Sequence, residues 1–107
     1  ELNTVPATLP ALMYAQKMQK RAARKGAFAQ TAEDAAAALK AAERSWEEAV
    51  PENAAERAGA LLFAAANAMR LAGVDAEEAL TFASGRFRQE LLQKTEDSDG
   101  QERPATV

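Results

Sequence analysis

Alanine is the most abundant residue in this 107-residue chain, whereas aromatic residues make up only 6% of it. Because Ala has the highest helix propensity of all residues and β-branched residues are few, the composition predicts an all-helical fold. A chain of this length fits one domain with a modest hydrophobic core. Ala buries little apolar area, so we expect the core of one copy to be thin, which favours pairing with a second copy.

Cysteine and histidine are both missing from the sequence. The chain therefore has no disulfide framework, no thiolate metal site and no imidazole base. Any metal would have to be bound by oxygen ligands, as Mg²⁺ or Mn²⁺ is. The net charge of -3 argues against binding to a nucleic acid polymer. No apolar run is long enough to span a membrane. No signal peptide is visible, and we expect a cytoplasmic protein.

Capping signals and apolar spacing predict four helices with short connections, so that neighbouring helices are expected to be antiparallel. The predicted helices cover residues 8–25, 31–49, 53–72 and 75–93. Thr31 opens the sequence TAED, which resembles a capping box, and Gly26 and Gly73 are helix stop signals. Thr8 is the expected cap of the first helix, and Trp46 is expected in the core. Residues 1–8 are predicted to be a linker, 9–93 a helical domain and 94–107 a disordered polar tail.

The first predicted helix carries a basic stripe opposite its apolar side. The cations of this stripe are Lys17, Lys20, Arg21, Arg24 and Lys25. The simpler interpretation is a solvated face with cations near the helix C-terminus, where they interact favourably with the helix dipole. A face that binds phosphate is the alternative.

Glu43 and Glu47 are four residues apart on the second predicted helix and share one face. Two carboxylates with this spacing can approach one divalent cation, although the same arrangement is common on solvated helices. Arg44 lies between them and can pair with Glu47. On the third predicted helix, Arg57 and Ala60 occupy the corresponding inward turn.

Three colinear segments resemble the MazG-type nucleoside triphosphate pyrophosphohydrolases. They are LPALMYAQKMQKRAARKG (9–26), GALLFAAANAMRLAGVDAEEAL (59–80) and FASGRFRQE (82–90). The resemblance implies an all-α, four-helix MazG-like bundle completed by a second subunit, and therefore a homodimer. It also implies cleavage of a nucleoside triphosphate to a monophosphate and pyrophosphate with Mg²⁺. The chain looks like the carboxy-terminal domain of a two-domain member, with a catalytic domain upstream.

In that family, carboxylates in the patterns E-E-x-x-E and E-x-x-D hold the Mg²⁺. Aligned on ERAGALLF, these patterns fall on Glu43, Arg44, Glu47, Arg57 and Ala60. Only Glu43 and Glu47 remain as a weak remnant of the metal site. Two Glu beside two Arg carry no net charge and can satisfy one another by charge-assisted hydrogen bonds. We therefore expect the site to be degenerate and the chain to need no cofactor.

These replacements favour a catalytically inactive domain that serves dimerisation or supports a neighbouring catalytic domain. Two alternatives remain open. In one, an active enzyme uses Arg44 and Arg57 to bind phosphates and Glu43 or Glu47 as the base. In the other, the domain binds a nucleotide or another phosphate ligand without turnover. The resemblance places the nucleotide-binding residues at Gln16, Lys17, Asn67, Arg70 and Arg86.

Overall fold

The computed structural model describes residues 4–28 and 31–97, and within these ranges it contains helices and no strand. The helices are α1 (Ala11–Arg24), α2 (Ala32–Glu47), α3 (Ala54–Leu71) and α4 (Ala76–Asp97). The prediction of an all-helical fold with four helices is therefore confirmed for the described residues. The chain divides into two compact units, residues 1–77 and residues 78–107.

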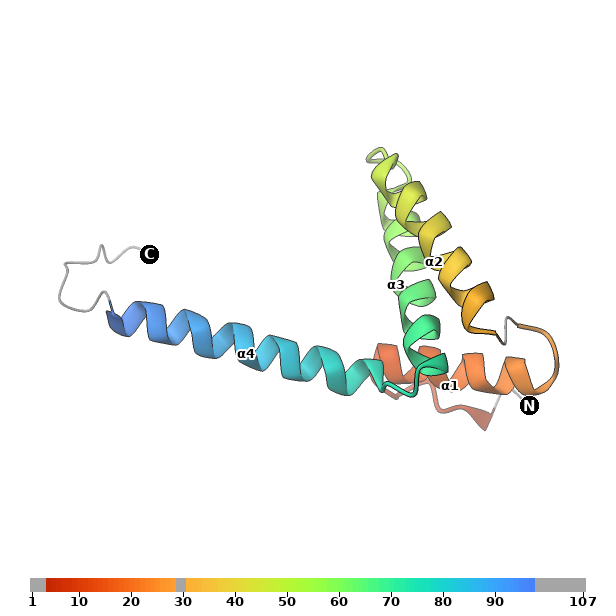
Figure 1. The fold of residues 1–107 in the computed structure, drawn as a ribbon, viewed down its shortest axis with the longest axis horizontal. Helices are drawn as coiled ribbons and strands as arrows, with labels where there is room; N and C mark the ends of the chain where they lie inside the picture. The colour runs from red at the N-terminus through yellow and green to blue at the C-terminus, as the bar shows by residue number, and fades with distance from the viewer. Residues whose placement is uncertain (1–3, 29–30, 98–107) are drawn as a thin grey trace. The chain divides into compact units, whose positions relative to one another are not determined.

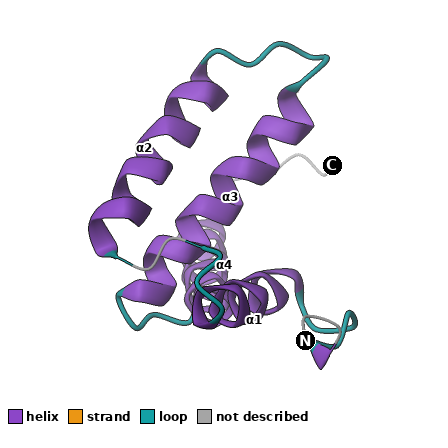
Figure 2. Cartoon of the chain, turned by 90° about the vertical axis from the view of Figure 1, so that its right-hand side faces the viewer, coloured by secondary structure: helices purple, strands orange, loops and turns teal. Residues whose placement is uncertain are grey.

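Helix α3 is the centre of the first unit, because it packs against both α1 and α2 (Figure 1). Helices α2 and α3 lie side by side and are joined at one end by residues 48–53 (Figure 2). The predicted antiparallel arrangement is confirmed for this pair. Among the described helices, α2 packs against α3 only, so no other helix covers its opposite side.

The helix ends follow the capping signals at three predicted positions. The Thr31 hydroxyl accepts a hydrogen bond from the backbone N–H of Asp34 at 2.9 Å, which caps α2. Gly26 and Gly73 have φ values of 76° and 79°, a left-handed conformation that Gly adopts without steric cost. Beyond Gly73, the Val74 N–H reaches back to the Met69 carbonyl at 2.8 Å, as in a Schellman motif.

The first helix starts at Ala11, later than predicted, and Pro10 rather than Thr8 occupies its N-cap position. Proline offers no side-chain oxygen for capping, and no side-chain cap bond is made there. The Glu77 carboxylate supplies one instead, because it accepts the backbone N–H of Leu12 at 3.2 Å. Glu77 is 65 residues away in sequence, so no local signal could have revealed this cap.

Helix α4 continues to Asp97, past the predicted end of the helical domain at residue 93. Within this extension, the Thr95 hydroxyl donates to the Leu91 carbonyl at 3.0 Å. The remainder of the predicted disordered tail, residues 98–107, and linker residues 1–3 lie outside the described residues. No helix in the described part of the chain is both long enough and apolar enough to cross a bilayer.

The core of the first unit consists of small side chains. Its fully buried hydrophobic residues, among those described, are Val5, Ala35, Ala66 and Ala76. Trp46, which was expected in the core, has 43% of its surface exposed. That expectation was wrong for a single copy, because the side of α2 that carries Trp46 is only partly covered by α3.

Candidate functional site

The positions that the MazG resemblance assigns to metal ligands lie on α2 and α3. Glu43, Arg44 and Glu47 are exposed on α2, and Ala60 is exposed on α3. Arg57 is half-buried, and its Nη1 donates a hydrogen bond to the backbone carbonyl of Ser45 at 2.9 Å. Ser45 lies between Glu43 and Glu47 in the sequence. The structure therefore fixes a permanent positive charge on the segment of α2 that carries the two carboxylates.

Among residues 4–28 and 31–97, no hydrogen bond or ion pair joins the side chains of Glu43 or Glu47 to those of Arg44 or Arg57. The pairing expected from the sequence is replaced by the bond from Arg57 to main chain. Over the same ranges, no three side chains of the types that bind metals gather at one place. Mg²⁺ favours octahedral coordination by oxygen, which two exposed carboxylates supply only in part.

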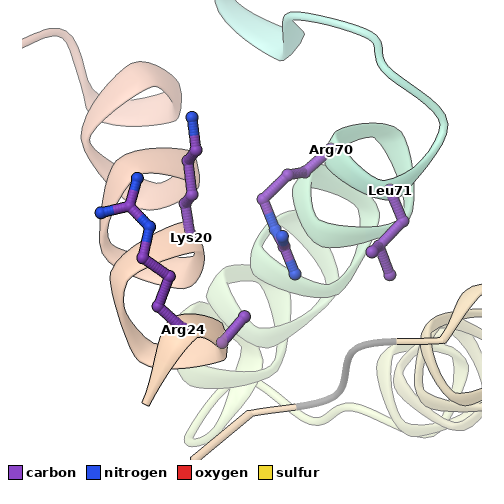
Figure 3. A pocket seen from close by; sticks show the side chains of 5 residues that line it. Lys20, Arg24, Arg70 and Leu71 are labelled. Carbon is purple, nitrogen blue, oxygen red and sulfur yellow. The ribbon is translucent and has the colours of Figure 1, made fainter. Parts of the chain in front are cut away.

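A second feature is a hollow between α1 and the end of α3 (Figure 3). Its volume is about 300 Å³, and its lining residues are Lys20, Ala23, Arg24, Arg70 and Leu71. We call this hollow the basic groove. Lys20 and Arg24 stand on α1, and Arg70 extends from α3 toward them. Three of the five lining side chains are cations, and none is acidic.

The basic groove follows directly from helix spacing. Lys17, Lys20 and Arg24 are separated by three and four residues, so they share one face of α1. Because α1 packs against α3, this face meets Arg70 in the last turn of α3. A neighbouring hollow of about 230 Å³ shares Lys20 and Arg70 with the groove. Its lining also includes Lys17 and the carboxylate of Asp75.

Gln16 was predicted to bind nucleotide, but its side-chain amide is hydrogen-bonded to the backbone of its own chain. Its Nε2 donates to the carbonyls of Ala66 at 2.9 Å and Val74 at 3.1 Å. Its Oε1 accepts the N–H of Ala76 at 3.1 Å. One amide thus connects α1 to α3, to the following turn and to the start of α4. This role is structural, and it leaves little of the amide for a ligand.

Asn67 is also used internally, since its Oδ1 accepts a hydrogen bond from the Nε of Arg70 at 3.0 Å. Only 3% of the Asn67 surface is exposed. Arg86 belongs to the second unit, where it is exposed and forms an ion pair with Glu90 at 3.7 Å. Of the predicted nucleotide-binding residues, the structure therefore brings Gln16, Lys17 and Arg70 to one hollow, and Asn67 is hydrogen-bonded to Arg70.

Gln19, which no sequence motif singled out, is buried with only 1% of its surface exposed. Its Nε2 donates to the Phe63 carbonyl at 3.0 Å, and its Oε1 has no hydrogen-bond partner in the described part of the chain. Gln19 lines a small apolar hollow of about 130 Å³ together with Met18, Ala22, Phe28 and Phe63. Helical spacing places Gln19 on the side of α1 opposite the basic stripe. This position is the one feature of the sequence that indicates its burial.

No known protein family and no curated protein matches this chain.

Proposed function

We propose that the chain is a MazG-like helical domain without metal-dependent pyrophosphohydrolase activity, and that it acts by assembling into a homodimer. The observation that carries the first part is the hydrogen bond from Arg57 to the Ser45 carbonyl. An arginine held at this place contributes a charge that cannot be removed by deprotonation.

The loss of ligands and the gain of cations both oppose binding of Mg²⁺. Relative to the MazG pattern, Arg44 and Arg57 replace two carboxylates and Ala60 replaces a third. Each Arg adds Coulomb repulsion toward a dication where a carboxylate would add attraction. Because these changes act in one direction, loss of the metal site accounts for them better than a change in substrate preference does.

The second part is supported by apolar side chains that a single copy leaves in water. On α3, Leu62 has 59% of its surface exposed and Phe63 has 43%. Taken by itself, α4 carries Leu80, Phe87 and Leu91 at spacings of seven and four residues, which places them on one face. Burying one such side chain contributes roughly 1.5–3 kcal/mol. A second copy would supply the core that the buried Ala residues do not.

The activity is tested by measuring pyrophosphate release from a panel of nucleoside triphosphates with Mg²⁺ or Mn²⁺. We expect no turnover above the protein-free rate. A triple variant, Arg44→Glu, Arg57→Glu and Ala60→Asp, restores the acidic pattern and serves as the comparison. Metal-dependent turnover by the unchanged chain would refute the proposal, whereas turnover by the triple variant alone would agree with it.

The assembly is tested by light scattering coupled to gel filtration. We expect the mass of a dimer for the unchanged chain and a monomer mass for Leu62→Glu, since a charge at the interface would be desolvated without a partner. Lys40→Glu changes an exposed residue of α2 and is the matched control. A monomer mass for the unchanged chain at about 100 μM would contradict the proposed dimer.

A further inference from the structure

We propose that the basic groove of Lys20, Arg24 and Arg70 is a binding site for an oligophosphate anion. This site is separate from the metal-ligand positions on α2 and α3. The inference goes beyond the proposed function, because assembly into a dimer requires no ligand.

Charge is the first argument. Three cationic side chains line the groove without an acidic one, in a chain whose net charge is -3. The side chains of Lys20 and Arg24 make no hydrogen bond or ion pair with another residue in the described ranges. Neither side chain is therefore paired with a carboxylate, which favours an anion from solution.

The second argument is the positioning of Arg70. Its Nε is bonded to Asn67, and the burial of Asn67 at 3% exposure holds that bond in place. A guanidinium is a planar fork whose geometry matches the oxygens of a phosphoryl group. Because the fork is oriented before a ligand arrives, less conformational freedom is lost on binding.

The third argument concerns the type of anion. The basic groove and the neighbouring hollow share Lys20 and Arg70. The neighbouring hollow adds Lys17 and one carboxylate, Asp75, so cations outnumber carboxylates across the two spaces. Two adjoining spaces that share cations suit linked phosphoryl groups better than one isolated phosphate. The amides of Gln16 and Asn67 are occupied by the protein, and the other groove residues are Ala23 and Leu71. The groove therefore offers charge for phosphoryl oxygens and little for the edges of a base.

Calorimetric titration of the full chain with sodium tripolyphosphate tests the site, at low ionic strength and with EDTA to exclude metals. We expect saturable binding with one site per chain. The affinity is expected to fall roughly tenfold in the double variant Lys20→Gln and Arg24→Gln, since each lost ion pair is worth up to about 1 kcal/mol. Both residues are exposed, so helix content measured by circular dichroism should not change.

The matched control is the double variant Lys40→Gln and Arg88→Gln, which removes the same charge from exposed positions of α2 and α4 that have no part in the groove. We expect its affinity for tripolyphosphate to stay within about twofold of the unchanged chain. Equal losses in the two double variants would overturn the proposal, because the binding would then follow net charge alone. An absence of binding at millimolar tripolyphosphate would overturn it as well.

Titrations with ATP and adenosine distinguish a free oligophosphate from a nucleotide. Equal affinity for ATP and tripolyphosphate, with none for adenosine, identifies the phosphoryl chain as the whole ligand. Tighter ATP binding that the groove variant abolishes identifies a nucleotide held by its phosphates. If a short oligothymidine binds while tripolyphosphate does not, the groove is a nucleic acid contact and the proposal fails. None of these measurements depends on turnover or on dimer mass, so they fail independently of the proposed function.

Discussion

Gln16 and Gln19 are one helical turn apart on α1, and both direct their Nε2 groups to carbonyls of α3. They differ in how completely each amide is satisfied. Gln16 makes three hydrogen bonds to the backbone, whereas Gln19 makes one and buries an Oε1 without a partner in the described chain. Replacing each by Met, which has a similar length and no amide, isolates this difference.

The expected magnitudes follow from the bonds lost. A protein hydrogen bond contributes about 1 kcal/mol net, and a buried donor left without a partner costs about 1–3 kcal/mol. Gln16→Met removes three bonds, of which the one to Val74 is exposed and can be replaced by water. It also strands the N–H of the buried Ala76. We therefore expect Gln16→Met to lower the free energy of unfolding by about 2–3 kcal/mol.

Gln19→Met loses one bond but also removes a buried oxygen that lacks a partner in the described chain. These effects oppose each other, and we expect a change within about 0.5 kcal/mol. Urea denaturation followed by circular dichroism at 222 nm measures both variants. Protein concentrations must be equal, because pairing makes stability depend on concentration. In thermal melts, the midpoint temperature of Gln16→Met should be roughly 10 °C below that of the unchanged chain. Equal losses, or a larger loss for Gln19→Met, would refute the reasoning.

Four further substitutions are measured in the same denaturation experiment. Thr31→Ala removes the cap of α2 and should cost about 1 kcal/mol; an unchanged midpoint would mean that water replaces the cap. Gly73→Ala should lower the free energy of unfolding by about 1 kcal/mol, whereas Gly59→Ala should raise it by about 1 kcal/mol. Gly73 has a positive φ, whereas Gly59 is helical with open space beside it. A destabilising Gly59→Ala would indicate that another chain packs closely there. Arg57→Met should lower the free energy of unfolding by about 1–2 kcal/mol, because the hydrogen bond to the Ser45 carbonyl is lost. A change near zero would show that this bond does not stabilise the fold.

The helix ends that could be predicted from sequence are those whose hydrogen bonds close over a few residues. Thr31 bonds to Asp34, and Gly26 and Gly73 are followed by short-range bonds back to the preceding helix. The start of α1 could not be predicted in this way. Its cap comes from Glu77, and the choice between Thr8 and Pro10 depends on that distant contact.

The candidate site shows the same division between local and distant information. The basic face of α1 was visible as a spacing of cations, but its alignment with Arg70 depends on how α1 packs against α3. Gln16 was assigned to a ligand from the MazG resemblance. Its bonds to the backbone could not be predicted, because the groups that it binds are 50 to 60 residues away. The exposure of Trp46 depends on which elements cover α2. The spacing of apolar residues along α2 does not reveal those elements.

The buried positions Ala35, Ala66 and Ala76 make the first unit sensitive to mutation in an unusual direction. A core of Leu or Phe is damaged mainly by truncation, which leaves cavities. An interior built from methyl groups has almost nothing to truncate, and the common hazard is enlargement, because an added methylene must push helices apart. Substitutions that enlarge these three buried Ala residues should therefore damage the first unit more than substitutions that shorten its side chains.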